Sequence, residues 1–351
     1  NKIITLCKIA ILARLTDKYI IKAAVLLPLL FACYFAPALY VQGACPSAPA
    51  PFTKIISLLI NTLPGNETSL PDSVILPLKR SGRLFFIEAN IDGVMGNLVF
   101  DSGAMGLVLN RTYFRDYVKS SLPSSGGATG PVGEVSRITV DRIQISDLVF
   151  ERTAANMVDL SHIENRRGLK VLGLLGLDNL RNFEMIINLN SEILQLYPVD
   201  KKGQRLSGEN APFHSDYFQE IEIMGGVVFV KVIIAGKTLR FCLDSAAETN
   251  ALSKDVPKAV METFSVTRTS LLRGAGSQTR EVLFGNFTDL SIGNVKLHPM
   301  TAVLSNLDYL SNSYDLHLDG ILGFDFFVKG MIRINFARKE MDIQFHQTEV
   351  K

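Results

Sequence analysis

The feature that most constrains this chain is an internal repeat. The segment FFIEANIDGVMGNLVFDSGAMGLVLN begins at Phe85, and VFVKVIIAGKTLRFCLDSAAETNALS begins at Val228. The two segments match in register at a separation of 143 positions, which places Asp101 and Asp244 at equivalent positions. Such self-similarity indicates two copies of one structural unit that pack against each other.

The repeat continues through the rest of each half. DRIQISDLVF from Asp141 matches TDLSIGNVKL from Thr288, and VLGLLGLDNL from Val171 matches LDGILGFDFF from Leu318. Here the separation is 147 positions, four more than 143. We therefore expect one loop to be four residues longer in the second copy, while the order of strands stays the same.

Within each copy, the apolar residues follow the pattern of short β-strands. Runs of five to eight residues rich in Val, Ile, Leu and Phe are separated by Asp-Gly, Gly-Asn, Ala-Gly and Gly-Gly turn signals. These are the signals of β-hairpins, and helical periodicity is scarce. The sequence therefore predicts a mainly β fold.

The composition divides the chain into five parts. We predict a signal peptide or membrane anchor at 1–44, a spacer at 45–72, a first lobe at 73–200, a linker at 201–213 and a second lobe at 214–348. The spacer is rich in Pro, Ser and Asn, and the linker falls in the polar stretch VDKKGQRLSGENAP.

The N-terminal part indicates export. An apolar run of 19 residues, Ala23 to Val41, follows Lys18 and Lys22 as in a signal peptide. A retained anchor stays open, because about 17–25 apolar residues span a bilayer. Lipid attachment at Cys33 or Cys45 is a third possibility. We expect the protein to be periplasmic, secreted or attached to the cell envelope.

Charge and metal-ligand spacing argue against other classes of function. The first 44 residues carry five basic residues and one acidic residue, so the remainder of this +2 chain is at −2 and has no run of Lys or Arg. A near-neutral body of this kind gives no basic surface for nucleic acid. The four Cys and five His lack metal-ligand spacing, so we expect neither a metal nor a cofactor.

Both copies place an acid at the end of an apolar strand, followed by small residues. The turns are Asp101-Ser102-Gly103-Ala104 and Asp244-Ser245-Ala246-Ala247. A carboxylate at such a place is costly to ionise unless it is hydrogen-bonded or paired. A pseudo-twofold axis between the copies would bring the acids together, and two carboxylates that share a proton can act as base and acid on one water.

These features together resemble the retropepsin-like and pepsin-like aspartic peptidases, over roughly Ser73 to Phe345. In that family each lobe has an Asp-Thr/Ser-Gly turn, a flap hairpin and a later strand of two apolar residues and Gly. This chain supplies the later strands as Leu174-Leu175-Gly176 and Ile321-Leu322-Gly323. Asp-Ser-Gly alone is a weak motif, but two in-register copies, each with its Gly strand at a matching distance, are specific.

The resemblance implies two closed β-barrel lobes related by a pseudo-twofold axis, with an active-site cleft between them. It implies an aspartic endopeptidase in which Asp101 and Asp244 activate a water. The implied supporting residues are Ser102 and Ser245, which would lock the turns, and Gly103, Ala246, Gly176 and Gly323. Loops around Gly127 and Gly276 would be flaps over a polypeptide substrate, and a monomer would suffice.

The roles of four further residues have to be considered. Ala246 stands where the family has Gly, so its Cβ either narrows the cleft or abolishes turnover. An inactive module that binds peptides at the cell envelope is therefore the second hypothesis. Glu248 is a candidate contact to substrate backbone, with a solvated loop residue as the alternative. Asp178 and Asp325 follow the Gly strands, where we expect them to cap a helical turn.

Overall fold

The computed structural model describes residues 73–118, 120–121, 126–127, 130–131, 135–207, 213–273 and 279–346. The predicted leader and spacer, with Cys33 and Cys45, lie outside the described residues, as does Gly276. Within the described ranges, no helix has the length and apolar character needed to cross a membrane.

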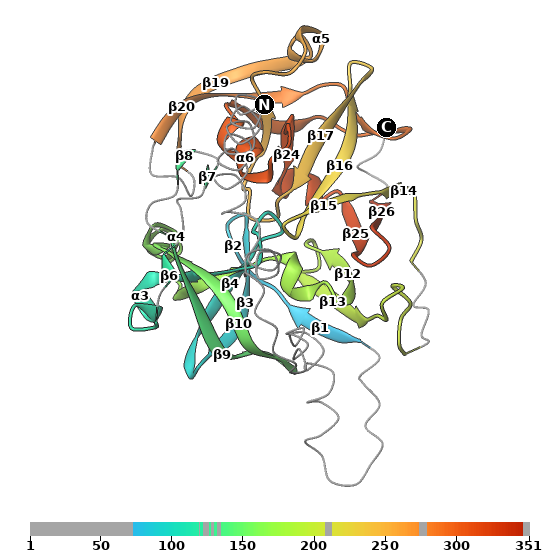
Figure 1. The fold of residues 1–351 in the computed structure, drawn as a ribbon. Helices are drawn as coiled ribbons and strands as arrows, with labels where there is room; N and C mark the ends of the chain where they lie inside the picture. Colours follow the sequence, from blue (N-terminus) through green and yellow to red (C-terminus); the bar gives the residue numbers. More distant parts are fainter. Residues whose placement is uncertain are drawn as a thin grey trace, which may run out of the picture.

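Strands dominate both halves of the chain, which confirms the mainly β prediction (Figure 1). The first half contains β1 (Val74–Pro77), β2 (Lys79–Ser81), β3 (Leu84–Ile91), β4 (Val94–Phe100), β5 (Leu107–Asn110), α3 (Arg111–Phe114), β6 (Ser120–Ser121), β7 (Gly126–Gly127), β8 (Gly130–Pro131), β9 (Ser136–Ile145), β10 (Leu148–Val158), α4 (Ser161–Arg167), β11 (Val171–Leu175), the 3-10 helix η1 (Leu177–Leu180), β12 (Phe183–Asn188) and β13 (Ile193–Pro198).

The second half repeats this order with small interruptions. It contains β14 (Tyr217–Glu220), β15 (Glu222–Met224), β16 (Val227–Ile234), β17 (Lys237–Leu243), β18 (Asn250–Ser253), α5 (Lys258–Met261), β19 (Phe264–Arg273), β20 (Thr279–Phe287), β21 (Leu290–Ile292), β22 (Val295–Lys296), β23 (Met300–Ser305), α6 (Asp308–Tyr314), β24 (Gly320–Leu322), α7 (Phe324–Phe327), β25 (Gly330–Asn335) and β26 (Glu340–Phe345).

The first lobe is a closed six-stranded barrel. Its strands follow the order β3-β4-β11-β5-β10-β9, and β9 pairs back with β3 to close the ring. The closing pairs are Asn90 with Gln144 and Ile91 with Ile143. Side chains that alternate inward along these strands, such as Ile143 and Ile145, fill the interior.

The second lobe follows the same path but its sheet curls into a half-barrel. Ile233 pairs with Ser291, which is the equivalent of the closing pair in the first lobe. However, the strand equivalent to β9 is divided into β20 and β21 by a bend at residues 288–289. The strand equivalent to β10 is divided into β22 and β23 around Pro299, which has no N–H to give to a ladder.

The structure locates the longer loop of the second copy. In the first lobe, β5 ends at Asn110 and α3 begins at the next residue, with the Asn110 side chain accepting from the Thr112 N–H. In the second lobe, β18 ends at Ser253 and α5 begins only at Lys258. The four additional residues are 254–257, which accounts for the change in separation from 143 to 147.

A sheet of six strands joins the two halves. Its order is β1-β13-β12-β25-β26-β14, so each half contributes three strands. At its centre β12 pairs antiparallel with β25, with Ile186 opposite Arg333, Met185 opposite Ile334 and Ile187 opposite Ile332. Met185 and Ile187 are the repeat equivalents of Ile332 and Ile334. The pseudo-twofold axis therefore passes close to the pair of Ile186 and Arg333.

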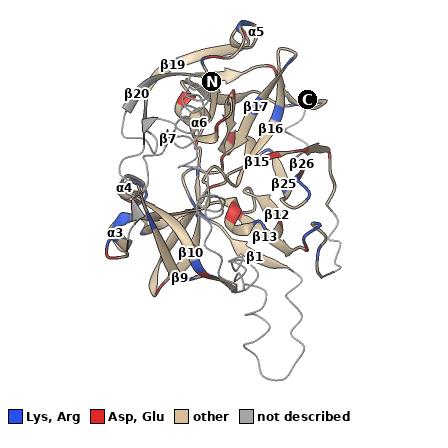
Figure 2. Cartoon of the chain, viewed as in Figure 1, with Lys and Arg blue, Asp and Glu red and all other residues tan. Residues whose placement is uncertain are grey.

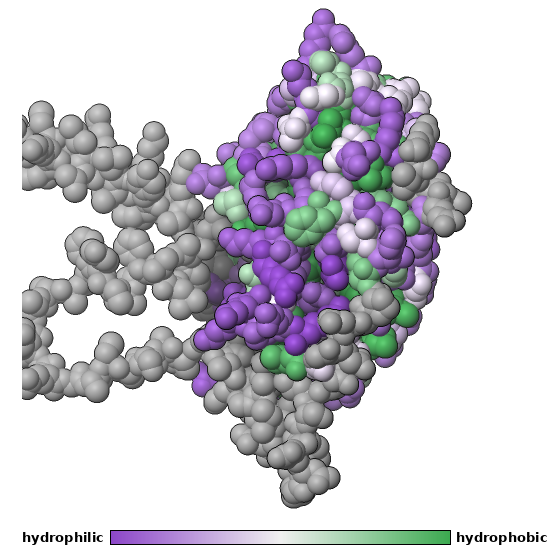
Figure 3. All heavy atoms as spheres, turned by 90° about the vertical axis from the view of Figure 1, so that its right-hand side faces the viewer, coloured by the Kyte–Doolittle hydropathy of each residue, from purple (hydrophilic) through white to green (hydrophobic). Residues whose placement is uncertain are grey.

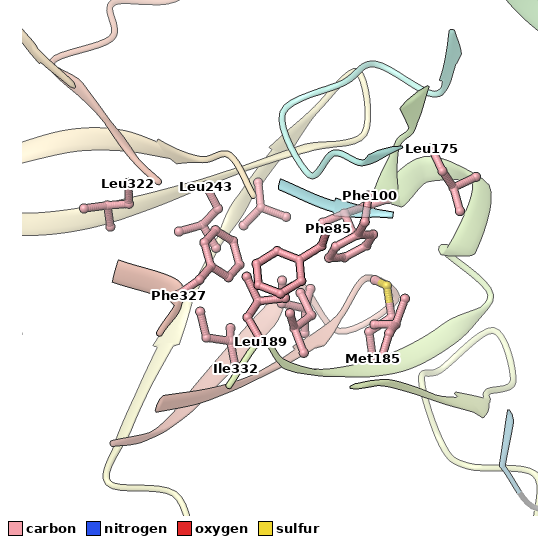
Figure 4. Packing of buried hydrophobic residues seen from close by; sticks show 14 of the residues in the cluster. Phe85, Phe100, Leu175, Met185, Leu189, Leu243, Leu322, Phe327 and Ile332 are labelled. Atoms are coloured by element: carbon pink, nitrogen blue, oxygen red, sulfur yellow. The ribbon is translucent and has the colours of Figure 1, made fainter. Parts of the chain in front are cut away.

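One large apolar core continues from each barrel into the central sheet. Its members come from both halves of the chain, and Figure 4 shows part of it, with Phe85, Phe100 and Met185 from the first half beside Leu322 and Phe327 from the second. Full burial of a side chain of this size contributes about 1.5–3 kcal/mol. The two lobes therefore share one continuous apolar core, which includes Phe100 and Leu243, the residues directly before Asp101 and Asp244.

The surface carries charges of both signs. Figure 2 shows Lys and Arg interspersed with Asp and Glu along the strands and turns of both lobes. The face in Figure 3 likewise mixes hydrophilic residues with smaller hydrophobic groups, as is usual for a protein surface.

A buried ion pair holds the segment that follows β13 against the central sheet. Nη2 of Arg205 lies 2.6 Å from Oε1 of Glu184 on β12, and both side chains are less than a tenth exposed. The Arg205 guanidinium also lies over the ring of Tyr197, 3.6 Å from its centroid. Asn335 on β25 donates to the other oxygen of Glu184 at 3.1 Å. The pair therefore connects both halves of the sheet with the start of the linker.

We predict that Arg205→Met lowers the free energy of unfolding by about 3–5 kcal/mol, because it leaves the Glu184 carboxylate buried without its partner. Urea denaturation measures this change. Lys296→Met is the control, because it breaks the half-exposed pair with Asp289 and should cost less than about 1 kcal/mol. Equal effects of the two substitutions would contradict the prediction.

Candidate active site

Equivalent strands deliver Asp101 and Asp244 to the interface between the lobes. Asp101 follows β4, and its backbone N–H donates to the carbonyl of Leu175 on the parallel strand β11 at 3.0 Å. Asp244 follows β17, and its N–H donates to the carbonyl of Leu322 on β24, also at 3.0 Å. The backbone of each acid is thus fixed by the strand that carries the apolar-apolar-Gly motif.

Gly176 and Gly323 end these two strands where the backbones approach closely. A Cβ on Gly176 would lie 2.4 Å from the carbonyl oxygen of Ala104, and a Cβ on Gly323 would lie 2.4 Å from that of Ala247. Both contacts are with backbone, which cannot move aside without displacing a catalytic turn. Gly323 also donates its N–H to Oδ1 of Asn250 at 2.7 Å.

Ser102 and Ser245 connect the two turns by reciprocal hydrogen bonds. The Ser102 hydroxyl donates to the carbonyl of Leu243 at 2.9 Å and accepts from the Ser245 N–H at 2.8 Å. The Ser245 hydroxyl donates to the carbonyl of Phe100 at 2.8 Å and accepts from the Ser102 N–H at 3.0 Å. Both side chains are fully buried. The structure thus places both serines between the turns.

The two carboxyl groups meet at this point. The two side chains are close enough for each to affect the pKa of the other. Backbone N–H groups hold each carboxyl as well: Gly103 donates to Oδ1 of Asp101 at 2.9 Å, and Ala246 and Ala247 each donate to Oδ1 of Asp244 at 2.9 Å. Each carboxyl is therefore held by backbone N–H groups of its own turn.

The two carboxyls have different surroundings, and their pKa values are raised to different extents. Burial raises the pKa of both carboxyls, and the neighbouring Asp244 charge raises the pKa of Asp101 further, to well above its usual range. At Asp244 the N–H donors of Ala246 and Ala247 oppose the effect of burial. A hydrogen bond to the charged form favours that form. The pKa of Asp101 is therefore raised further than that of Asp244, and the two acids titrate as one coupled pair.

Ala246 and Gly103 occupy equivalent turn positions in different surroundings. A Cβ on Gly103 would lie 2.7 Å from Cγ of Asp244, inside the pair of acids. The Ala246 side chain instead packs against a small apolar cluster of the first lobe, which contains Leu84, Phe86, Val99 and Val171. The backbone N–H of Ala246 still binds its aspartate at the same 2.9 Å as Gly103 does. The additional methyl group leaves the hydrogen bonding of the turn intact.

Glu248 is not a solvated loop residue. Its carboxylate lies 2.5 Å from Nη2 of Arg167 and 3.4 Å from Nη1 of Arg166, both at the end of α4 in the first lobe. Its backbone carbonyl accepts from Nη1 of Arg83 at 2.8 Å. The alternative of a free, solvated side chain is therefore wrong, because the opposite lobe supplies basic partners.

Asp178 and Asp325 do not cap helical turns. Gly176 and Gly323 are the N-cap residues of η1 and α7, and neither helix has a side-chain cap. Asp325 instead pairs with Arg83 of the first lobe at 3.2 Å. Asp178 pairs with Arg181, three residues further on, at 3.4 Å. The capping prediction was wrong because the Gly strands turn directly into their helices, which leaves these acids to face other elements.

The candidate flap around Gly127 reaches the opposite lobe. Gly126–Gly127 and Gly130–Pro131 pair as the short hairpin β7–β8, and β7 lies against α6 of the second lobe (Figure 1). The other candidate, Gly276, belongs to the residues that the structure leaves undescribed, between β19 and β20.

No metal-binding cluster is found in the described part of the chain, that is, no group of three or more His, Cys, Asp or Glu side chains able to hold an ion. Cys242 is a free thiol, buried beneath the second turn, and burial raises its pKa well above the usual range. A protonated, inaccessible thiol does not act as a nucleophile.

The structure adds four residues that the sequence did not suggest. Arg83 and Arg167 contact the second lobe, Asn250 binds the Gly323 N–H, and the hydroxyl of Tyr314 donates to the carbonyl of Gly103 at 3.3 Å. The repeat itself contains a signal for two of them. Arg167 and Tyr314 are 147 positions apart and end equivalent helices, so the change of residue type marks a place where the copies differ.

Comparison with known protein families agrees with this geometry. Residues 230–326 match the model of a family described as aspartyl protease. The match extends from β16 into α7 and includes Asp244, its turn and Gly323. The match supports an aspartyl protease of the retropepsin-like family. No curated protein matches the chain.

We predict that Asp101→Asn stabilises the folded protein near neutral pH. Because its folded pKa is raised above the usual 3.8, the folded state binds this proton more tightly than the unfolded chain does. Its contribution to stability is complete below about pH 3.8 and is lost as pH rises through the folded pKa. Each unit of pKa shift corresponds to about 1.4 kcal/mol. The asparagine variant should therefore show a higher Tm than the parent at pH 7.

Asp289→Asn is the matched control, because hydrogen bonding to Lys296 lowers the pKa of Asp289. Its stabilising contribution is present above pH 3.8 and is lost as pH falls, so this substitution should lower the Tm at pH 7 slightly. Thermal unfolding at several pH values distinguishes the two signs. A lower Tm for Asp101→Asn at pH 7 would contradict the raised pKa of Asp101.

Proposed function

We propose that this protein is an aspartic-type endopeptidase, which hydrolyses polypeptides through a water activated by Asp101 and Asp244. The observation that carries the proposal is the pair of equivalent turns, locked by Ser102 and Ser245, which bring the two carboxyls together between the lobes. Two buried carboxyls that share one proton provide a base and an acid at the same place.

The higher pKa of Asp101 supports an assignment of the acid and base roles in the proposed reaction. Asp244, ionised, accepts a proton from the water as its oxygen attacks the scissile carbonyl carbon. Asp101, protonated, donates its proton to the carbonyl oxygen, which yields a tetrahedral gem-diol. In the second step Asp244 gives its proton to the leaving nitrogen, a gem-diol hydroxyl returns a proton to Asp101, and the C–N bond breaks. The pair ends in its starting state, so no other group has to titrate.

The position of the Ala246 methyl supports turnover over the alternative of an inactive peptide-binding module. That alternative arose because a Cβ at the third turn position was expected to crowd the site. The methyl packs against the apolar cluster that includes Leu84 and Phe86. Both N–H donors to Asp244 are retained.

We also propose that a single exported chain is sufficient for activity. Both acids and both locking serines come from one chain, so no second copy is needed to complete the pair. Export rests on the apolar run from Ala23 to Val41. The proposed substrate lies in an extended form between the lobes, with the β7–β8 hairpin near it.

The direct test is cleavage of an unfolded protein from about pH 3 to 8, because a coupled pair of acids makes the rate depend on pH. We expect the purified protein to cleave, and Asp101→Asn and Asp244→Asn each to reduce the rate at least about 100-fold, because either change removes one of the two proton carriers. Asp178→Asn, which alters an acid outside the pair, should keep the parent rate.

The result also decides between the two hypotheses. A folded parent protein that binds a labelled unfolded polypeptide but does not cleave it at any pH would favour the binding module. Loss of activity in the Asp178→Asn control would contradict the assignment of the two catalytic residues.

The two turns should respond in opposite ways to a change of one methyl group. Gly103→Ala places a Cβ 2.7 Å from Cγ of Asp244, and a displacement of about 1 Å in a catalytic group can reduce the rate about 100-fold. Ala246→Gly removes a methyl from an apolar cluster, which costs about 1 kcal/mol of stability and leaves the acids in place.

We therefore predict that Gly103→Ala loses activity and that Ala246→Gly keeps most of it. The ratio kcat/KM measures the first effect, and the free energy of unfolding measures the second. A large rise in kcat/KM for Ala246→Gly would show that the native methyl obstructs catalysis, contrary to the proposal.

A further inference from the structure

Two equivalent helices dock across the interface between the lobes, each onto the catalytic turn of the opposite lobe. Helices α4 (Ser161–Arg167) and α6 (Asp308–Tyr314) each have seven residues and lie 147 positions apart. The last residue of α4, Arg167, pairs with Glu248 in the loop after Asp244. The last residue of α6, Tyr314, binds the carbonyl of Gly103 in the turn after Asp101. The two helices occupy equivalent places, but one forms an ion pair with a side chain and the other a hydrogen bond to a backbone carbonyl.

Tyr314 is held firmly in this position. Its side chain is 5% exposed, and its ring packs edge-on against Phe229 with 5.2 Å between centroids. Burial raises the pKa of its hydroxyl well above the usual range, so the group stays protonated and keeps its donor. The acceptor, the Gly103 carbonyl, lies in the other lobe at 3.3 Å.

The peptide unit that Tyr314 binds is the one that faces Asp101. The Gly103 carbonyl and the Ala104 N–H belong to the same planar peptide group. The Ala104 N–H donates to the backbone carbonyl of Asp101 at 3.2 Å and also favours the ionised form of its carboxyl. Fixing one end of a planar group fixes the direction of the other end. The Tyr314 hydroxyl therefore holds one end of the peptide unit whose other end donates to Asp101.

We propose that Tyr314 is a positioning residue for the catalytic pair: by donating to the Gly103 carbonyl it fixes the peptide between residues 103 and 104 and so orients the carboxyl of Asp101. This inference rests on the proposed peptidase function for its effect on catalysis. The structural part, that Tyr314 sets the environment of Asp101, holds whether or not the protein cleaves peptides.

The second turn is supported differently. The residue equivalent to Tyr314 in the first copy is Arg167, which pairs with the Glu248 carboxylate. On this turn Ala247, the equivalent of Ala104, donates to the Asp244 carboxylate at 2.9 Å. The two turns are thus held by different contacts from the opposite lobe, Tyr314 at the first and Arg167 at the second.

Few titratable groups in the described chain face Asp101. They are Asp244 on the opposite turn, Cys242 on β17 and Tyr314 on α6. Burial keeps the Cys242 thiol and the Tyr314 hydroxyl neutral, so Asp244 is the one charged neighbour that titrates together with Asp101. A change in the titration of the pair on removal of the Tyr314 hydroxyl therefore reports on the position of the peptide.

The test compares the parent with Tyr314→Phe, which keeps the ring on Phe229 and removes the hydroxyl. Carboxyl ¹³C NMR titration should show the Asp101 pKa shifted upward, since a misdirected Ala104 N–H stabilises the ionised form less. The alkaline limb of the kcat/KM profile should move to higher pH by the same amount. We expect kcat to fall about 10-fold, the equivalent of one hydrogen bond, with little change in KM.

Two matched variants separate positioning from general loosening. Tyr117→Phe removes a hydroxyl that donates to Asp92 at 2.7 Å elsewhere in the first lobe, and Arg167→Met removes the contact made by the equivalent helix. Neither should change the Asp101 titration. Tyr314→Leu, which loses the ring as well, should add a loss of Tm that Tyr314→Phe does not show.

An unchanged Asp101 titration in Tyr314→Phe would overturn the inference, as would the same shift in Tyr117→Phe or Arg167→Met. If the parent itself cleaves nothing, the proposed peptidase function fails. The carboxyl titration still decides the role of Tyr314 in that case, because it requires no turnover.

Discussion

The reciprocal hydrogen bonds of Ser102 and Ser245 are the interaction on which the site depends. The two hydroxyls use both donor and acceptor capacity across the interface, and they bind the carbonyls of Phe100 and Leu243, directly before each aspartate. Both serines are fully buried, so water cannot replace either partner. Loss of one partner would cost about 1–3 kcal/mol for each buried group left unsatisfied. The two lobes are therefore coupled at the residues that carry the acids.

Symmetry brings the acids together, and departures from symmetry make them different. The duplicated strands and glycines give Asp101 and Asp244 the same backbone geometry, with the same 3.0 Å bond from each N–H to the opposite carbonyl. The residues around them differ between the two copies: Gly103 is equivalent to Ala246 in the repeat, and Arg167 is equivalent to Tyr314. Two carboxyls in identical surroundings would share a proton equally, so in the proposed mechanism these differences provide the base and the acid.

The repeat made much of the fold and of the candidate site predictable. Matching apolar runs indicated the β strands, and the change in separation from 143 to 147 indicated one longer loop, which residues 254–257 supply. The partners of Glu248 and Asp325 could not be predicted, because Arg167 and Arg83 lie far away in the sequence and meet them only across the interface. The capping prediction for Asp325 failed for the same reason.

The sequence by itself determined that two copies of one unit would each present an acid at the end of an apolar strand, because strand pattern, turn residues and spacing are local properties. Only the tertiary structure decided how the acids differ. The direction of the peptide after Gly103, the placement of the Ala246 methyl and the docking of Tyr314 all arise from contacts between lobes. Those contacts depend on packing over distances that no local pattern encodes, and they are what distinguish Asp101 from Asp244.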